Sequence, residues 1–198
     1  MEMSQPIMEL SELNFDNYFK VSKYRIFSSL LIIVYIWCLP LLSRIGFAEK
    51  NETTISGFIA NSHATGALAA LSFTPLTLMW EYQRYLLRKI EYKKYKNKLS
   101  VSLSAYQFFY GGFLVCTVNY VPDWLHTTTV VLFSVTFVGH SCITMYCIQP
   151  TLLGKVDLVL GIVGCTCLLF VKGLWFWFFE CIGFTSMMLF TPIELLNT

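Results

Sequence analysis

The chain has 198 residues, of which 56 % are hydrophobic and only 13 % are charged, whereas soluble domains carry about 25 % charged residues. Its net charge of +2 gives no reason to expect binding to nucleic acid, which calls for a strongly basic surface. The apolar residues come in long blocks that approach or meet the length of a transmembrane helix, about 20 residues. This composition excludes an ordinary soluble domain and predicts an all-α, polytopic membrane protein.

We expect residues 1–25 to form a cytosolic segment, because they are polar and acidic and lack the basic start and early apolar run of a secretory signal. A transmembrane domain of six helices follows over residues 26–191, and residues 192–198 form a cytosolic tail. The predicted spans are about 26–47, 56–80, 101–121, 125–148, 156–171 and 174–191. Pro40 predicts a kink in the first span. The fifth span is the shortest, and whether it crosses fully stays open.

Lysine and arginine are unevenly distributed between the two sides of these spans. With the N-terminus in the cytosol, eleven fall on the cytosolic side and three on the opposite side. Because positive residues favour the cytosolic side, we expect both termini to be cytosolic. The acceptor sequence Asn51-Glu52-Thr53 lies in the loop that this topology makes lumenal, which makes Asn51 a candidate N-glycosylation site.

The loop after the second span is strongly basic. Its cations are Arg84, Arg88, Lys89, Lys93, Lys94, Lys96 and Lys98. Seven cations between two spans help to fix the topology. They also attract anionic lipid head groups, by about 1 kcal/mol per cation near the surface. We therefore expect this loop to face anionic lipid, and the two interpretations are compatible.

The seven cysteines lie inside or beside apolar blocks and lack the spacing of zinc ligands. We expect them to be small buried residues, with Cys147, beside a span end, as a candidate for palmitoylation. The sequence contains no HExxH, nucleophile-elbow or phosphate-loop motif. Neither a metal nor a cofactor is therefore predicted.

Polar side chains inside a bilayer are costly and mark functional sites by default. The candidates are Glu180, His126, His140, His63 and Asn61. Glu180 falls about midway along the last predicted span, where desolvation disfavours an unpaired charged carboxylate. It either packs a neighbouring helix through a hydrogen bond or faces a polar cavity as a proton acceptor, cation site or lipid contact.

The histidines have similar alternatives. His140, flanked by small residues, is expected to form a hydrogen bond across a helix interface, and His63 has the same character nearer the lumenal end of its span. His126 follows Asp123 by three residues at the start of the fourth span. The two form either an interfacial, helix-capping turn or a lumenal acid–base pair. Asp157 is expected to be solvated near the cytosolic boundary.

Four stretches and the six-span layout carry a resemblance to a known family. The second span ends in WEYQRYL, and the third is approached through NKLSVSLS. The fourth contains LHTTTVVLFSVTFVGHSCITMY, and the last contains WFFECIGF. With these features the chain resembles the damage-regulated autophagy modulators, whose relatives include the post-GPI-attachment factors. The resemblance implies that Glu180 and His126 match positions where this family places polar residues. The first lumenal loop, AEKNETTIS, is shorter than the family pattern and lacks its Pro, Asp and Gly residues.

The resemblance implies a non-enzymatic protein of an endomembrane (ER, Golgi or lysosome) or of the plasma membrane. Its role would be in lipid organisation, GPI-anchor lipid maturation, or regulation of autophagy and membrane trafficking. Glu180, His126 and His140 would contact a lipid head group or a partner helix. The alternatives are a structural subunit of a larger membrane complex, a lipid-modifying enzyme using Asp123 and His126, and a proton-coupled transporter using Glu180 and His140.

Overall fold

The computed structural model describes residues 24–89, 93–117, 122–148 and 150–196. Within these ranges the chain is helical and contains no strand, which confirms the all-α prediction. A helix at Tyr24–Trp37 is followed by the short helices α2 (Leu39–Arg44) and α3 (Ile55–Phe58). Five longer helices complete the described chain: α4 (Ser62–Lys89), α5 (Lys93–Thr117), α6 (Asp123–Ile148), α7 (Leu152–Cys167) and α8 (Leu174–Leu196).

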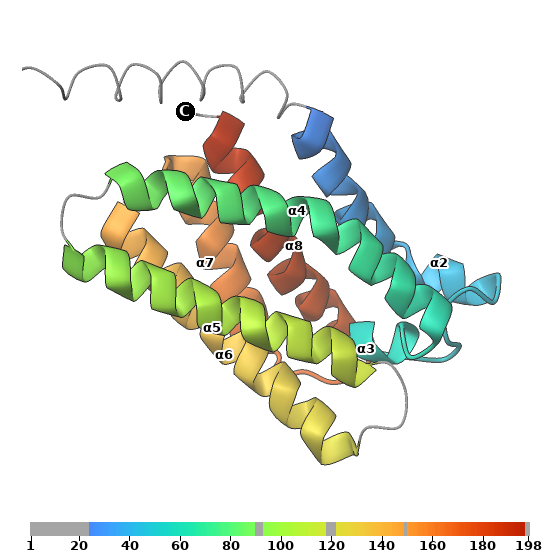
Figure 1. Cartoon of the computed structure of the whole chain (residues 1–198). Coiled ribbons are helices and arrows are strands. Elements are labelled where there is room, and N and C mark those ends of the chain that lie inside the picture. Colours follow the sequence, from blue (N-terminus) through green and yellow to red (C-terminus); the bar gives the residue numbers. More distant parts are fainter. Residues whose placement is uncertain (1–23, 90–92, 118–121, 149, 197–198) are drawn as a thin grey trace, which may run out of the picture.

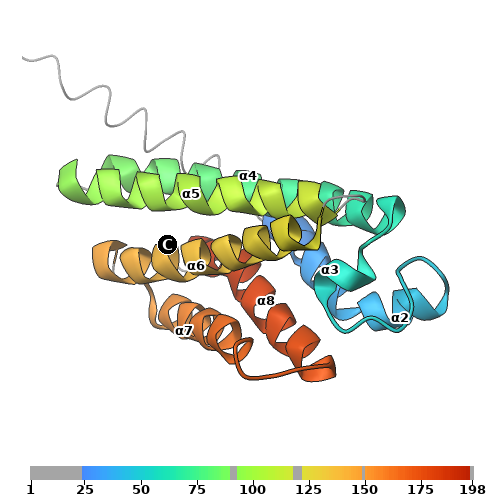
Figure 2. The same ribbon diagram turned by 90° about the horizontal axis from the view of Figure 1, so that it is seen from below.

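The five longer helices pack as a ring, shown in Figures 1 and 2. α6 lies between the α4–α5 pair and the α7–α8 pair, and α8 closes the ring against α4. The helix Tyr24–Trp37 packs outside the ring against both α4 and α8. Tyr35 Oη donates to the Ala64 carbonyl oxygen in α4 at 2.7 Å, and Trp37 Nε1 donates to Thr185 Oγ1 in α8 at 2.9 Å.

The bundle has two distinct ends, because the successive long helices run in alternate directions (Figure 1). Ile26, near the start of the described chain, and Leu195, near its end, belong to one buried cluster. We call this end of the bundle the terminal end. α2, α3 and the starts of α6 and α8 lie at the opposite end, which we call the α3 end. Both ends of the described chain thus lie at the same end of the bundle.

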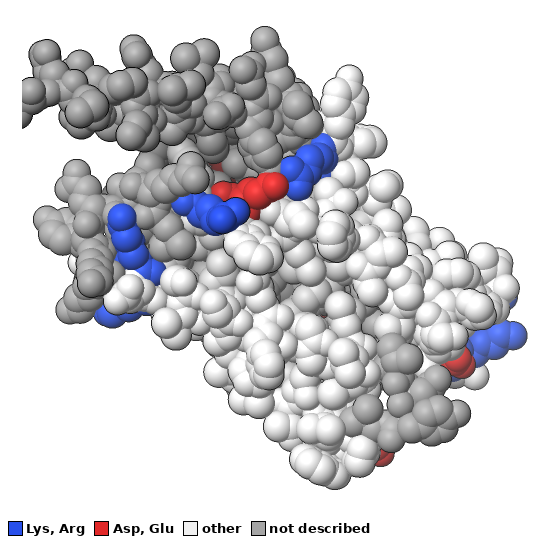
Figure 3. All heavy atoms as spheres, in the orientation of Figure 1, with Lys and Arg blue, Asp and Glu red and all other residues white. Residues whose placement is uncertain are grey.

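Three of the described helical segments are long and apolar enough to cross a membrane, namely Tyr95–Thr117 within α5, Asp123–Ile148 and Leu174–Leu196. Large apolar side chains face outward, as at Phe73 and Phe108, which are 71 % and 74 % exposed. On the face in Figure 3, charged side chains gather at the two ends and a broad uncharged surface separates them. Such a large apolar surface is typical of contact with lipid. The structure therefore supports an integral membrane protein.

The helix boundaries differ from several predicted spans. α5 begins at Lys93 and not at 101, and α7 is Leu152–Cys167 and not 156–171. The first predicted span is broken at Cys38, because Pro40 stands in the first turn of α2. The second contains a break between α3 and α4, and α4 continues to Lys89. The last continues as α8 through Pro192 to Leu196, so most of the predicted tail is helical.

Candidate functional site

A cavity of about 50 Å³ lies in the half of the bundle nearest to the α3 end. It is walled by α5, α6, α7 and α8 and by the first residue of α3. The wall is mainly apolar, and its aromatic residues are Phe113, Phe133, Phe137, Phe179 and Phe184. Its polar side chains are Glu180, Ser134 and Cys165. Since a water molecule needs only about 10–15 Å³ of such space, the cavity has room for a small polar group.

Glu180 supplies the carboxylate of this cavity. Its Oε2 accepts a hydrogen bond from the backbone N–H of Ile55 at an N···O distance of 2.6 Å. Ile55 is the first residue of α3, so the carboxylate binds one of the amides that a helix start leaves without an intrahelical partner. No residue that the structure describes donates to Oε1 of Glu180. The ion pair Arg25–Glu81 is the only one among the described residues, so no described basic side chain neutralises Glu180.

The depth of Glu180 differs from the predicted position midway along its span. Glu180 is the seventh residue of α8, about 9 Å from the start of a helix that is about 33 Å long. The difference arises because α8 continues to Leu196, beyond the predicted end. The carboxylate therefore lies between the midpoint of α8 and its α3 end.

Aromatic contacts also hold α3 against α8. The ring of Trp177, three residues before Glu180 on α8, packs edge-on against Phe58 of α3 with 6.3 Å between ring centroids. Trp177 packs in the same way against Trp37, at 5.8 Å. Ile55 and Phe58 are both buried. α3 therefore forms a packed cover over one side of the cavity.

His140 belongs to a separate buried network that joins α4, α5 and α6. Its Nδ1 lies 2.9 Å from Ser102 Oγ, and its Nε2 lies 3.2 Å from Gln83 Nε2. Its ring is stacked on Tyr106, with 5.8 Å between centroids. His140 thus forms hydrogen bonds across a helix interface. No hydrogen bond among the described residues links this network to Glu180.

The remaining predicted polar residues lie apart from one another. His126, in the first turn of α6, is partly exposed and lies beside the cavity residue Phe113, with 6.4 Å between their rings. His63 is exposed in the first turn of α4. Asn61 caps α4, since its Oδ1 accepts a backbone N–H of the first turn at 2.8 Å. In the described ranges no hydrogen bond joins Asp123 to His126.

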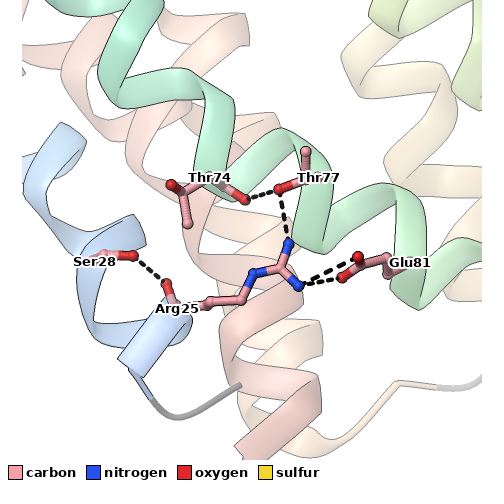
Figure 4. Close-up of polar contacts among 5 residues, drawn as sticks. All are labelled: Arg25, Ser28, Thr74, Thr77 and Glu81. Atoms are coloured by element: carbon pink, nitrogen blue, oxygen red, sulfur yellow. Dashed lines mark hydrogen bonds and ion pairs between the residues drawn. The ribbon is translucent and has the colours of Figure 1, made fainter. Parts of the chain in front are cut away.

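The basic loop lies only partly within the described residues. Arg84 and Lys98 are exposed and Lys96 is partly exposed. The side chains of Arg88, Lys89, Lys93 and Lys94 lie outside the described part of the chain. The first helix is joined to α4 near this loop, where Arg25 Nη1 lies 2.9 Å from Glu81 Oε2 and Nη2 donates to Thr77 Oγ1 at 3.0 Å (Figure 4). Asn51 is exposed in the loop before α3 and has a φ of 62°.

Sequence reasoning missed a buried carboxylate, Glu194, in what was predicted to be the tail. Its Oε1 accepts hydrogen bonds from the backbone N and the Oγ1 of Thr151, at 3.0 and 2.6 Å, and so fixes the N-cap residue of α7. Tyr82 Oη donates to Oε2 at 3.4 Å. The available signal was an acid within the apolar stretch FTPIELL.

The expectation that Asp157 is solvated is wrong. Asp157 is only 8 % exposed, because α7 packs closely against α8 at this level. Ser186 Oγ of α8 donates to its backbone carbonyl at 2.7 Å and lies 3.3 Å from its Oδ2. The close packing follows from glycines in α7 that allow the two helices to approach.

No protein-family model matches this chain, and neither the curated proteins nor the solved structures include a match. The resemblance to the damage-regulated autophagy modulators therefore rests on the quoted stretches and the predicted six-span layout alone. The chemistry must be argued from the cavity itself. Among the described residues, no hydrogen bond joins Glu180 to Ser134 or Cys165, so the cavity residues do not form a bonded nucleophile–base pair.

Proposed function

We propose that this chain is a non-enzymatic, six-span membrane protein that binds a membrane lipid in the cavity at Glu180. The observation that carries the proposal is a carboxylate that no described basic side chain neutralises, in an otherwise largely apolar cavity that five phenylalanines help to line. Ligand sites are mostly apolar and contain a few polar groups that fix the orientation of the ligand. Here the apolar wall suits the apolar part of a lipid, and the carboxylate suits a polar group of its head.

The proposed topology places both termini in the cytosol. It is supported by the alternating directions of the long helices and by the common position of both ends of the described chain. The excess of lysine and arginine on that side points the same way. The α3 end, with the cavity and Asn51, would then face the lumen or the outside. The basic loop would meet anionic lipid of the cytosolic leaflet.

The resemblance to the damage-regulated autophagy modulators supports a role in lipid organisation, GPI-anchor lipid maturation or autophagy. The compartment would be an endomembrane or the plasma membrane. Direct hydrogen bonds of His140 and Asn61 to other parts of the chain give these two residues structural roles. We therefore assign the lipid contact to Glu180. His126 lies beside Phe113 in the wall of the same cavity.

The test is native mass spectrometry of the purified protein with analysis of the lipids that co-purify. Glu180→Gln retains the size of the side chain and a hydrogen-bond acceptor but cannot ionise. Asp123→Asn makes the same chemical change at an exposed residue of the same end and serves as the control. We expect one lipid class to be lost from Glu180→Gln and kept by Asp123→Asn. Identical lipid profiles from the wild type and both folded variants would refute the proposal.

A further inference from the structure

The hydrogen bond between Glu180 and Ile55 is not needed to start α3. The helix has its own cap, because Thr54 Oγ1 accepts the backbone N–H of Gly57 at 2.8 Å. Desolvating a carboxylate is costly unless it is well paired and hydrogen-bonded. A single neutral amide on Oε2 leaves Oε1 without a described donor. The carboxylate therefore has capacity for more and stronger donors than α3 provides.

The surroundings of this carboxylate favour a cation. Phe113, Phe133, Phe179 and Phe184 line the same cavity, and the faces of aromatic rings attract ammonium groups. A charged donor also makes a stronger hydrogen bond to a carboxylate than a neutral amide does. A primary ammonium brings three donors, enough to serve both oxygens of Glu180. A quaternary ammonium carries the same charge but has no N–H to donate.

We propose that the cavity takes the primary ammonium of a lipid head group, and that the Ile55 amide occupies its place when the cavity is empty. The inference rests on the proposed lipid-binding function and specifies its ligand. Binding of the ammonium releases Ile55 from Glu180 and loosens α3 from α8. α3 thus competes with the ligand, and the apparent dissociation constant rises as the fraction of open protein falls.

Ile55→Pro tests the competition directly, because it removes the donor and leaves the carboxylate intact. Residue 55 is the first of α3, the position at which proline is favoured in helices. Thr54 has φ −135° and ψ 153°, which lies in the region that a residue before proline adopts. The matched control is Ile55→Val, which keeps the N–H and has as many side-chain carbons as proline.

The assay is a titration of the full-length protein in detergent with phosphatidylethanolamine or phosphatidylcholine, followed by native mass spectrometry. We expect Ile55→Pro to bind phosphatidylethanolamine at least about tenfold more tightly than Ile55→Val, which corresponds to about 1.4 kcal/mol. Phosphatidylcholine should bind more weakly, and equally to both variants. Glu180→Gln should lose the preference for phosphatidylethanolamine.

Each contrary result removes a different part of the reasoning. Equal affinities of Ile55→Pro and Ile55→Val for phosphatidylethanolamine would overturn the competition by α3 and leave lipid binding at Glu180 intact. Equal binding of the two lipids by the wild type would overturn the ammonium assignment. If lipid binding did not depend on Glu180 at all, the proposed function would fail as well.

A second measurement needs no substitution in α3. Hydrogen exchange of the wild-type backbone over residues 55–58 should become faster when phosphatidylethanolamine is added, and should not respond to phosphatidylcholine. Since this readout follows the Ile55 amide itself, it decides the question if Ile55→Pro does not fold. Unchanged exchange at saturating phosphatidylethanolamine would overturn the release of α3.

Discussion

Alanine at Gly164 would place a methyl group against the backbone of α8. An added Cβ would lie 2.9 Å from the backbone N of Gly183 and 3.1 Å from the carbonyl oxygen of Phe179. Both distances are shorter than an ordinary van der Waals contact, which begins at 3.4 Å. Backbone atoms cannot rotate away as side chains do, so α7 and α8 must separate. Overpacking of this kind costs about 1–3 kcal/mol, and alanine recovers up to about 1 kcal/mol through helix propensity.

We therefore expect Gly164→Ala to lower the free energy of unfolding by up to about 2 kcal/mol relative to the wild type, the overpacking cost less the propensity gain. Gly139→Ala is the matched control, because a Cβ at Gly139 meets nothing within 4 Å. Because both variants gain helix propensity, they should differ by the overpacking cost of about 1–3 kcal/mol. At about 2–4 °C per kcal/mol, thermal unfolding of the detergent-solubilised protein should give a Tm about 2–12 °C lower for Gly164→Ala than for Gly139→Ala. The separation should also disturb the cavity, since Cys165 and Gly183 line it. Equal Tm values for the two variants would refute the close approach of α7 and α8.

Three further substitutions probe contacts outside the cavity, all by thermal unfolding. Glu194→Ala leaves the buried Tyr82 hydroxyl and the half-buried donors of Thr151 unpaired and should cost about 1–3 kcal/mol. A loss no larger than that of the exposed Glu49→Ala would contradict this role of Glu194. Asn61→Ala should cost about 0.5–2 kcal/mol through loss of a helix cap, while its exposed neighbour Ser62→Ala should not. Glu81→Ala should cost under about 1 kcal/mol through loss of its partly solvated ion pair with Arg25, and the difference from the wild type should shrink in high salt.

The membrane class could be predicted because it depends on composition and on block length, which a single sequence shows directly. The ends of the helices were harder to predict from the sequence. Pro40 did mark the break in the first span, yet Pro192 did not end α8. The packing of α8 against α7, including the hydrogen bonds that fix the N-cap residue of α7 to Glu194, outweighs the cost of that proline. Such packing depends on residues far away in the sequence.

The candidate site shows the same limit. The sequence singled out Glu180 as unusual, but its partner, the Ile55 amide, lies 125 positions away. A backbone amide leaves no mark in a sequence, because every residue except proline has one. His140 was recognised by its small neighbours, whereas Gln83 and Ser102 look ordinary until the fold brings them to the imidazole. Residue types could therefore be predicted, and their partners could not.

The cap on α7 constrains how the chain is made. α7 has 16 residues, about 24 Å at the rise of a helix, which is short of a hydrocarbon core about 30 Å thick. The amide of its N-cap residue, Thr151, is bound by Glu194, 43 positions later, which the ribosome adds only after nearly all of α8. We therefore expect α7 to wait at the insertion machinery and to enter the bilayer together with α8 as a hairpin. A chain that stops before Glu194 should be rapidly degraded in a pulse–chase experiment, and normal persistence of that chain would argue against coupled insertion.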